Sequence, residues 1–141
     1  MTEIHSYGVG DASYQAAGQL AGLTLLVNDF YDYMETLPAA KVIRDMHPAD
    51  MTETRTKLIY FLSGWLGGPR LYQQQYGQIR LPWFHQSMPI GEAERNAWML
   101  CMEKAVAEQP FAESFKQYLI QQLWVPAERI NAVCQAHQRR E

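Results

Sequence analysis

His85 is the residue of this 141-residue chain whose surroundings best suit chemistry at a metal. Its sequence neighbours Trp83, Phe84, Met88 and Ile90 are large and apolar, so they would exclude water from the imidazole. A neutral imidazole in such a shell binds a metal through one ring nitrogen while the other donates to a carbonyl. The alternative is a core histidine satisfied by the protein itself, which the periodicity alone favours.

Apolar helical segments flank His85 on both sides. Gly-Trp-Leu-Gly-Gly-Pro precedes it at 64–69, and Pro-Ile-Gly-Glu-Ala-Glu-Arg-Asn-Ala-Trp follows it at 89–98. A single histidine between two such segments suits one axial ligand of a flat, apolar cofactor. Haem is the first candidate.

The other three histidines have plainer explanations. His5 lies in a polar start, and His137 lies near the end of the last predicted helix, where a cation meets the negative end of the helix dipole. His47 precedes a proline at a corner. There it either bonds a nearby carbonyl or takes part in a functional site, and the sequence leaves both open.

Other reaction classes lack their residues. The chain has no Gly-x-Ser-x-Gly, Walker-type loop or His-Glu-x-x-His, and no flavin- or nicotinamide-binding segment. Glu92 and Glu94 are two positions apart, so they cannot share one helix face as a carboxylate pair. Hydrolysis and phosphoryl transfer therefore have no visible machinery.

The amino-acid composition argues against several classes of binding partner. The net charge of −3 comes with scattered Lys and Arg residues, which argues against nucleic acid. No run of about 18 apolar residues and no signal-like start occur, so we expect a cytoplasmic protein that does not enter membranes. Cys101 and Cys134 have no metal-finger spacing, and we expect both to be buried thiols.

Apolar residues recur at intervals of three and four, which is typical of amphipathic helices. The sequence predicts helices at 12–18, 19–37, 38–46, 50–66, 91–108 and from 110 onward, with short helical turns joined by loop over 70–90 and a fraying tail over 135–141. Gly67-Gly68-Pro69 should end the fourth helix, and Pro126 should kink or break the last one.

Two of these helices have clear inner faces. In 19–37 the apolar stripe is Leu23, Leu26, Val27, Phe30, Tyr31, Met34 and Leu37, with Asn28, Asp29, Asp32 and Glu35 facing away. In 91–108 the inner face carries Ala97, Trp98, Cys101, Met102 and Ala105.

A set of short motifs in a fixed order completes the pattern. They are Phe30-Tyr31-Asp32, Leu37-Pro38, Met46-His47-Pro48, Phe61-Leu62, Gly67-Gly68-Pro69, Tyr72, Tyr76-Gly77, and His85 followed by residues 89–98 with Trp98. In this order, from about Ser13 to Val133, the chain resembles the group II truncated haemoglobins of bacteria and plants. The resemblance implies an all-α truncated globin fold, one domain over 1–141 with a core at about 13–134, in which two helices pack over two around haem.

The resemblance also implies roles for individual residues. His85 becomes the proximal ligand of the iron in haem b, which leaves the sixth position for oxygen, nitric oxide or carbon monoxide. Tyr31, Trp98 and His47 become hydrogen-bond donors on the opposite, distal face. A phenol, an indole and an imidazole all donate to a ligand atom of partial negative charge.

The remaining predicted pocket residues line the haem or its edge. They are Phe30, Thr54, Leu58, Phe61, Leu62, Tyr72, Arg80, Phe84, Met88 and Ile90. Thr54 stands where larger globins often carry a distal histidine. Many family members have a basic residue at Phe84 and a Phe at Met88, so Arg80, Tyr72 and Lys57 are the candidates to hold the propionates.

The function implied is binding of oxygen and related diatomic ligands, or redox handling of oxygen, nitric oxide or peroxide with an external reductase, by a monomer or homodimer. The alternative is a cofactor-free helical interaction module in which the aromatic stripes are only core. Bound haem distinguishes the two.

Overall fold

The computed structural model describes residues 7–77 and 90–139, and these ranges contain helices, turns and loops but no strand. In chain order the elements are α1 (Ala12–Ala16), α2 (Gln19–Thr36), the 3₁₀ helix η1 (Pro38–Ala40), α3 (Lys41–Asp45), α4 (Thr52–Trp65), α5 (Leu71–Tyr76), α7 (Glu92–Ala107) and α8 (Glu113–Arg139). The predicted all-α class is confirmed.

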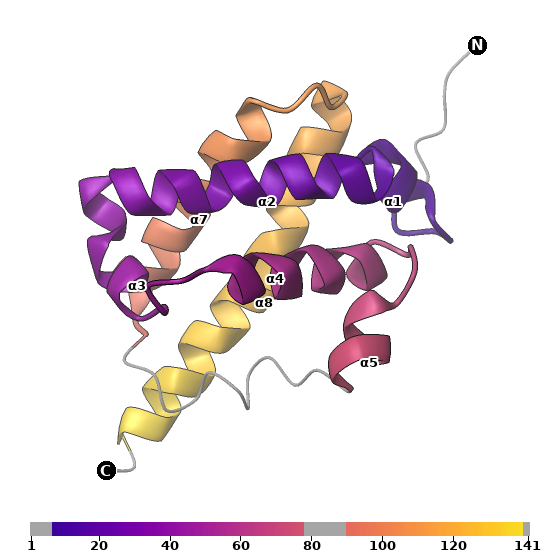
Figure 1. The fold of residues 1–141 in the computed structure, drawn as a ribbon. Helices are drawn as coiled ribbons and strands as arrows, with labels where there is room; N and C mark the ends of the chain where they lie inside the picture. Colours follow the sequence, from indigo (N-terminus) through magenta and orange to yellow (C-terminus); the bar gives the residue numbers. More distant parts are fainter. Residues whose placement is uncertain (1–6, 78–89, 140–141) are drawn as a thin grey trace.

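The four long helices form two layers. Helices α2 and α4 lie side by side in front, and α7 and α8 cross behind them (Figure 1). The layers meet where α2 packs against α7. This is the two-over-two arrangement that the sequence predicts.

Helix α2 supplies the largest part of the core. Its buried side chains are Leu23, Leu26, Val27, Phe30, Tyr31 and Met34. They recur at intervals of three and four, so they form one stripe along the helix. The helix ends at Thr36, two residues before Pro38, as expected from the restriction that proline places on the preceding residue.

A corner connects α2 to α4. Pro38 is the first residue of η1, where its fixed φ angle suits the start of a helix. After α3, the guanidinium of Arg44 donates to the carbonyls of Pro48 and Ala49, at 3.1 and 3.3 Å. These bonds hold the loop that carries His47.

The start of α7 is fixed by its own first turn. The backbone N–H of Gly91 donates to Oε1 of Glu94 at 2.7 Å, which satisfies an amide that the helix leaves without a partner. The inner face of α7 is the predicted one: Ala97, Cys101, Met102 and Ala105 are buried, and Trp98 is half-buried. Cys134 is buried too, so both thiols lie where the sequence predicts.

The structure corrects the start of the last helix and part of the expectation for Pro126. Pro110 does not start α8, which begins at Glu113, and Pro126, predicted to kink or break the helix, does not break it, because the helix continues to Arg139. A proline inside a helix removes one backbone hydrogen bond. Here Arg95 of α7 contacts both sides of it, with its guanidinium 5.4 Å from the Trp124 ring centre and paired with Glu128. The same continuity makes 135–139 helical rather than a frayed tail.

The end of α4 depends on glycine at position 67. Gly67 has a φ angle of +91°, and a Cβ atom there would lie 1.9 Å from the carbonyl oxygen of Gly10. The N-terminal segment therefore approaches the end of α4 as closely as it does only because this residue has no side chain. Within the described residues, no helix is long and apolar enough to span a membrane.

Gly67→Ala should destabilise the protein by more than the roughly 1–2 kcal/mol of a left-handed alanine, because a steric clash adds to the backbone strain. Gly10→Ala is the control, since Gly10 also has a positive φ angle, +54°, but nothing lies within 4 Å of the added Cβ. Denaturant unfolding compares the two free energies. Equal losses would show that the contact with Gly10 is not a constraint.

Candidate functional site

The predicted site residues divide into those that the structure describes and those that it does not. His85, Arg80, Phe84 and Met88 lie outside the described residues, so the proximal side stays a prediction. Ile90 is half-buried directly before α7.

The three predicted distal residues are connected by ring contacts, in which Phe30 links Trp98 to Tyr31 and Tyr31 contacts His47. The Phe30 ring contacts Tyr31 edge to face with centroids 4.8 Å apart, and Trp98 of α7 with centroids 5.0 Å apart. The His47 ring lies 6.0 Å from that of Tyr31. Residues from α2, the corner and α7 thus form one aromatic cluster, and such edge-to-face pairs are favourable beyond the area they bury.

Tyr31 is the most enclosed polar residue of this cluster. Its side chain is 5% exposed, and burial raises the pKa of its hydroxyl, an effect that the positive charge of Arg55 partly offsets. Within the described ranges the hydroxyl makes no hydrogen bond, and neither does the indole N–H of Trp98. Two donors of the cluster are therefore free to bind something that is not protein.

His47 is tied to its own helix. Its Nδ1 lies 2.7 Å from the carbonyl oxygen of Ile43, so Nδ1 carries the proton and donates. In the neutral ring, Nε2 is then an acceptor. The carbonyl bond that the sequence leaves open is present, and His47 donates to a ligand only when its ring is protonated.

The inner side of α4 carries the other predicted pocket residues. Leu62 is buried, whereas Thr54, Leu58 and Phe61 are half-exposed. Phe61 stacks on Trp65 with centroids 6.1 Å apart. Leu58 and Phe61 pack against the core without being fully covered by the described residues, so part of each side chain stays available to a flat apolar group.

A hollow of about 550 Å³ lies at the N-terminal end of α4. Thr54, Lys57 and Tyr76 are among the residues that line it. The ammonium of Lys57 lies 5.2 Å from the centre of the Tyr76 ring, and Tyr72 packs against Tyr76 with centroids 5.0 Å apart. Two of the three propionate candidates, Lys57 and Tyr72, therefore surround the same ring.

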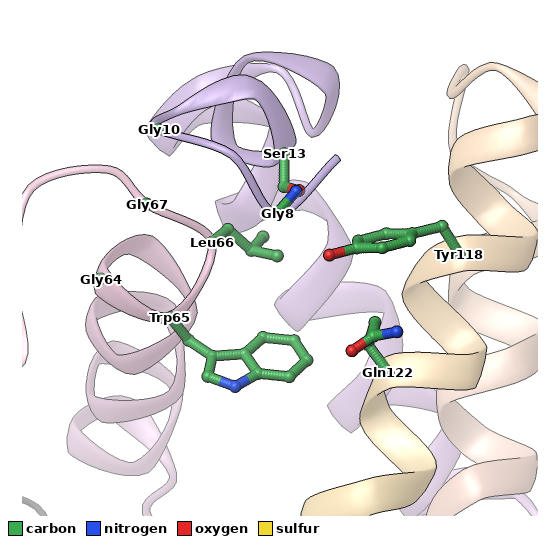
Figure 2. A pocket seen from close by; sticks show the side chains of 9 residues that line it. All are labelled: Gly8, Gly10, Ser13, Gly64, Trp65, Leu66, Gly67, Tyr118 and Gln122. Carbon is green, nitrogen blue, oxygen red and sulfur yellow. The ribbon is translucent and has the colours of Figure 1, made fainter. Parts of the chain in front are cut away.

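A second pocket, of about 190 Å³, lies between the N-terminal segment, the end of α4 and α8. Figure 2 shows the ring of Trp65 and the hydroxyl of Tyr118 pointing into it. Its lining also includes Ser13, whose hydroxyl accepts the backbone N–H of Gly8 at 2.9 Å. None of the predicted site residues lines this pocket.

Arg55 is not among the residues predicted from the sequence. Its guanidinium donates to the carbonyl and side-chain oxygens of Asn28 and to Asp32, and lies 5.5 Å from the centre of the Tyr31 ring. The sequence predicts that Asn28 and Asp29 face away from the protein, but both are half-buried. Asp29 accepts the side-chain amide of the buried Gln109 at 2.7 Å. An arginine next to Thr54 and two polar residues one turn apart are the signal that could have indicated this contact.

Comparison with known proteins identifies the family. The model of the bacterial-like globin family matches residues 12–129, which is most of the chain. The chain belongs to this family. It is 32% identical over 129 residues to the group 2 truncated hemoglobin YjbI of Bacillus subtilis, an alignment that covers 92% of this chain and 95% of that protein.

Comparison with solved structures gives the same family. The cold-adapted truncated hemoglobin of the Antarctic bacterium Pseudoalteromonas haloplanktis matches with a TM-score of 0.80 at 34% identity, over 84% of this chain and 95% of that one. The group II 2-on-2 hemoglobin of Agrobacterium tumefaciens also gives 0.80, at 32% identity over 92% and 97%. In sequence and fold this globin is therefore similar to the group II truncated haemoglobins, as the motifs predict. At the level of the family this supports haem-based oxygen binding.

Tyr31→Phe should change how stability depends on pH. Because burial raises the folded-state pKa above the ordinary value near 10, the neutral phenol stabilises the fold below about pH 10 and less as the pH rises further. The variant lacks this loss, so its free energy of unfolding should fall less between about pH 10 and 11.5. Denaturant titrations across that range measure it. Parallel profiles for the two proteins would contradict the buried environment of Tyr31.

Proposed function

We propose that this globin binds haem b through His85 and takes oxygen, nitric oxide or carbon monoxide at the opposite face, beside Tyr31 and Trp98. The observation that carries the proposal is the pair of hydrogen-bond donors without a protein partner in one aromatic cluster, within the described part of a truncated globin fold. Removing a donor that such a ligand uses is unfavourable by about 1–3 kcal/mol, so two donors left to the ligand fit this function.

The chain fits haem in its described part. The half-exposed Leu58 and Phe61 of α4 offer an apolar surface to a flat group, and the free donors lie on the α2 and α7 side of it. Haem, when bound, supplies an iron that accepts one protein nitrogen and one diatomic molecule. In the proposal Tyr31 and Trp98 orient that molecule by donating to it, and the cluster around Phe30 excludes water.

At the outer edge, Lys57 and Tyr72 are the described residues proposed to hold the propionates. Lys57 is already paired with Glu53 at 3.3 Å, and its ammonium lies above the Tyr76 ring. A carboxylate arriving there would exchange with Glu53 for the same cation. Arg80, outside the described residues, is the third candidate.

We also propose redox handling of nitric oxide or peroxide by the haem. This activity requires an electron donor from another protein. The chain has no flavin- or nicotinamide-binding segment, so its own residues supply binding and orientation only. Steady-state consumption of nitric oxide with a reductase, compared with free haem, measures this part.

The purified protein should show a Soret band and, when ferrous with carbon monoxide, the spectrum of a six-coordinate haem with a histidine ligand. His85→Ala should lose that band, because the iron loses its protein nitrogen. His5→Ala is the matched control and should keep it, since His5 lies in the polar N-terminal start. A folded, colourless protein that rejects added hemin would contradict the proposal and favour the cofactor-free module.

Tyr31→Phe and Trp98→Phe should each release oxygen faster, by roughly 5- to 150-fold, because one donor in a dry pocket contributes about 1–3 kcal/mol. Stopped-flow measurement of the dissociation rate tests this. Tyr33→Phe is the control on the same helix, since its hydroxyl donates to Glu108 at the surface. Unchanged rates in both site variants would remove Tyr31 and Trp98 from the ligand side.

A further inference from the structure

We propose that Arg55 is a positioning residue for Tyr31, holding the phenol ring in one orientation by clamping the turn of α2 that carries it. The inference deepens the proposed function and rests on it, because it concerns the donor assigned there to the diatomic ligand. The inference assigns a role to a residue of α4 that acts through Tyr31 and not by contact with haem.

The clamp spans one turn of α2, from Asn28 to Asp32, and this turn includes Tyr31. Nη1 of Arg55 donates to the carbonyl oxygen of Asn28 at 3.2 Å and to its side-chain oxygen at 3.1 Å. Nη2 donates to Oδ1 of Asp32 at 3.1 Å. Asn28 and Asp32 are four residues apart, so they lie on one face of α2, and Tyr31 lies between them in sequence.

The guanidinium also covers the ring. Its central carbon lies 5.5 Å from the centroid of Tyr31, within the range of a cation–π contact. With Phe30 at 4.8 Å and His47 at 6.0 Å, the phenol ring has three neighbours, each from a different segment. Rotation of the ring about its side-chain bonds would break at least one of these contacts.

Geometry rather than charge makes the clamp effective. The Asp32 carboxylate is 66% exposed, so its ion pair with Arg55 contributes little on its own. Arginine, however, presents its donors in a rigid planar fork, and here both terminal nitrogens reach α2 while the group lies against the ring. A lysine has the charge but only one nitrogen to place.

The positive charge has a second effect on the same group. Arg55 lowers the pKa of the Tyr31 hydroxyl, against the larger effect of burial. Burial makes the phenol less acidic and so a weaker hydrogen-bond donor, and Arg55 partly opposes this effect. Both the orientation of the ring and the strength of its hydroxyl as a donor therefore depend on Arg55.

The test compares Arg55→Met and Arg55→Lys with Tyr31→Phe in the ferrous carbon monoxide form. The carbon monoxide stretching band should move in the same direction in Arg55→Met as in Tyr31→Phe, with a smaller shift in Arg55→Lys, and oxygen dissociation should be about 2- to 10-fold faster in Arg55→Met. Arg95→Met is the matched control. It removes an arginine that also covers an aromatic ring, Trp124, and pairs with a glutamate, but contacts α8 rather than α2.

A double variant isolates the mechanism. In a Tyr31→Phe background, Arg55→Met should not move the band further, because Arg55 acts through the hydroxyl that is already absent. An equal shift with and without Tyr31 would overturn the proposal. So would an unchanged band in Arg55→Met when the band does respond to Tyr31→Phe. If Arg55→Met fails to fold, the same comparison is made with Arg55→Lys, alone and in the Tyr31→Phe background.

A second readout separates this inference from the proposed function. The NMR signal of labelled Tyr31 Cζ, identified by its loss in Tyr31→Phe, should shift in Arg55→Met but not in Arg95→Met, whether or not the band responds to Tyr31. A band insensitive to Tyr31→Phe would contradict the ligand role of Tyr31 and leave the clamp standing on this signal. An unchanged signal in Arg55→Met would overturn the clamp.

Discussion

Burial of the apolar stripe of α2 between α4 and α7 is the constraint on which the rest of the structure depends. The stripe extends from Leu23 to Met34, and its members are almost entirely excluded from water. A side chain of this size gains about 1.5–3 kcal/mol on burial, so the position of α2 relative to both neighbours is strongly fixed. Phe30 is the clearest case, since its ring contacts Tyr31 on its own helix and Trp98 on α7. The candidate site is therefore part of the core packing, and its residues are held by the same contacts that hold the helices.

The polar side of α2 also contacts the neighbouring helices. Asn28 and Asp32 bind Arg55 of α4, and Asp29 binds the amide of Gln109 just after the end of α7. These bonds attach α2 to both neighbours on the faces that hydrophobic packing does not reach. They restrict rotation of α2 about its own axis, which would otherwise move Tyr31 toward or away from the site. Directional hydrogen bonds complement a hydrophobic effect that has no direction of its own.

Features that depend on one residue's own conformation are predicted correctly from the sequence, whereas features that depend on contacts between helices are not. Helix ends at Pro38 and Gly67 follow from φ angles that each residue prefers alone, so they can be predicted without a structure. The continuation of α8 through Pro126 cannot, because local rules do not include contacts from another helix, such as those that Arg95 makes with Trp124 and Glu128 on either side. Arg55 is missed for the same reason: its pairing with Asn28 requires the register of α4 against α2. Tyr31 and Trp98 follow from the resemblance, and the contact of each with Phe30 is information that only the fold supplies.

The hydroxyl on the buried ring of Tyr31 is hard to explain by stability alone. Phenylalanine has nearly the same shape and would fill the same space between Phe30, His47 and Arg55 without a polar atom that lacks a partner in the described protein. Without the hydroxyl, the acceptor atom of a bound ligand would lack a partner, which is unfavourable by about 1–3 kcal/mol. The cation–π contact with Arg55 does not explain the hydroxyl, because a phenylalanine ring would make the same contact. The ring of Tyr31 is therefore explained by core packing, and its hydroxyl by the ligand proposed to accept from it, while Arg55 contacts the ring that carries this donor.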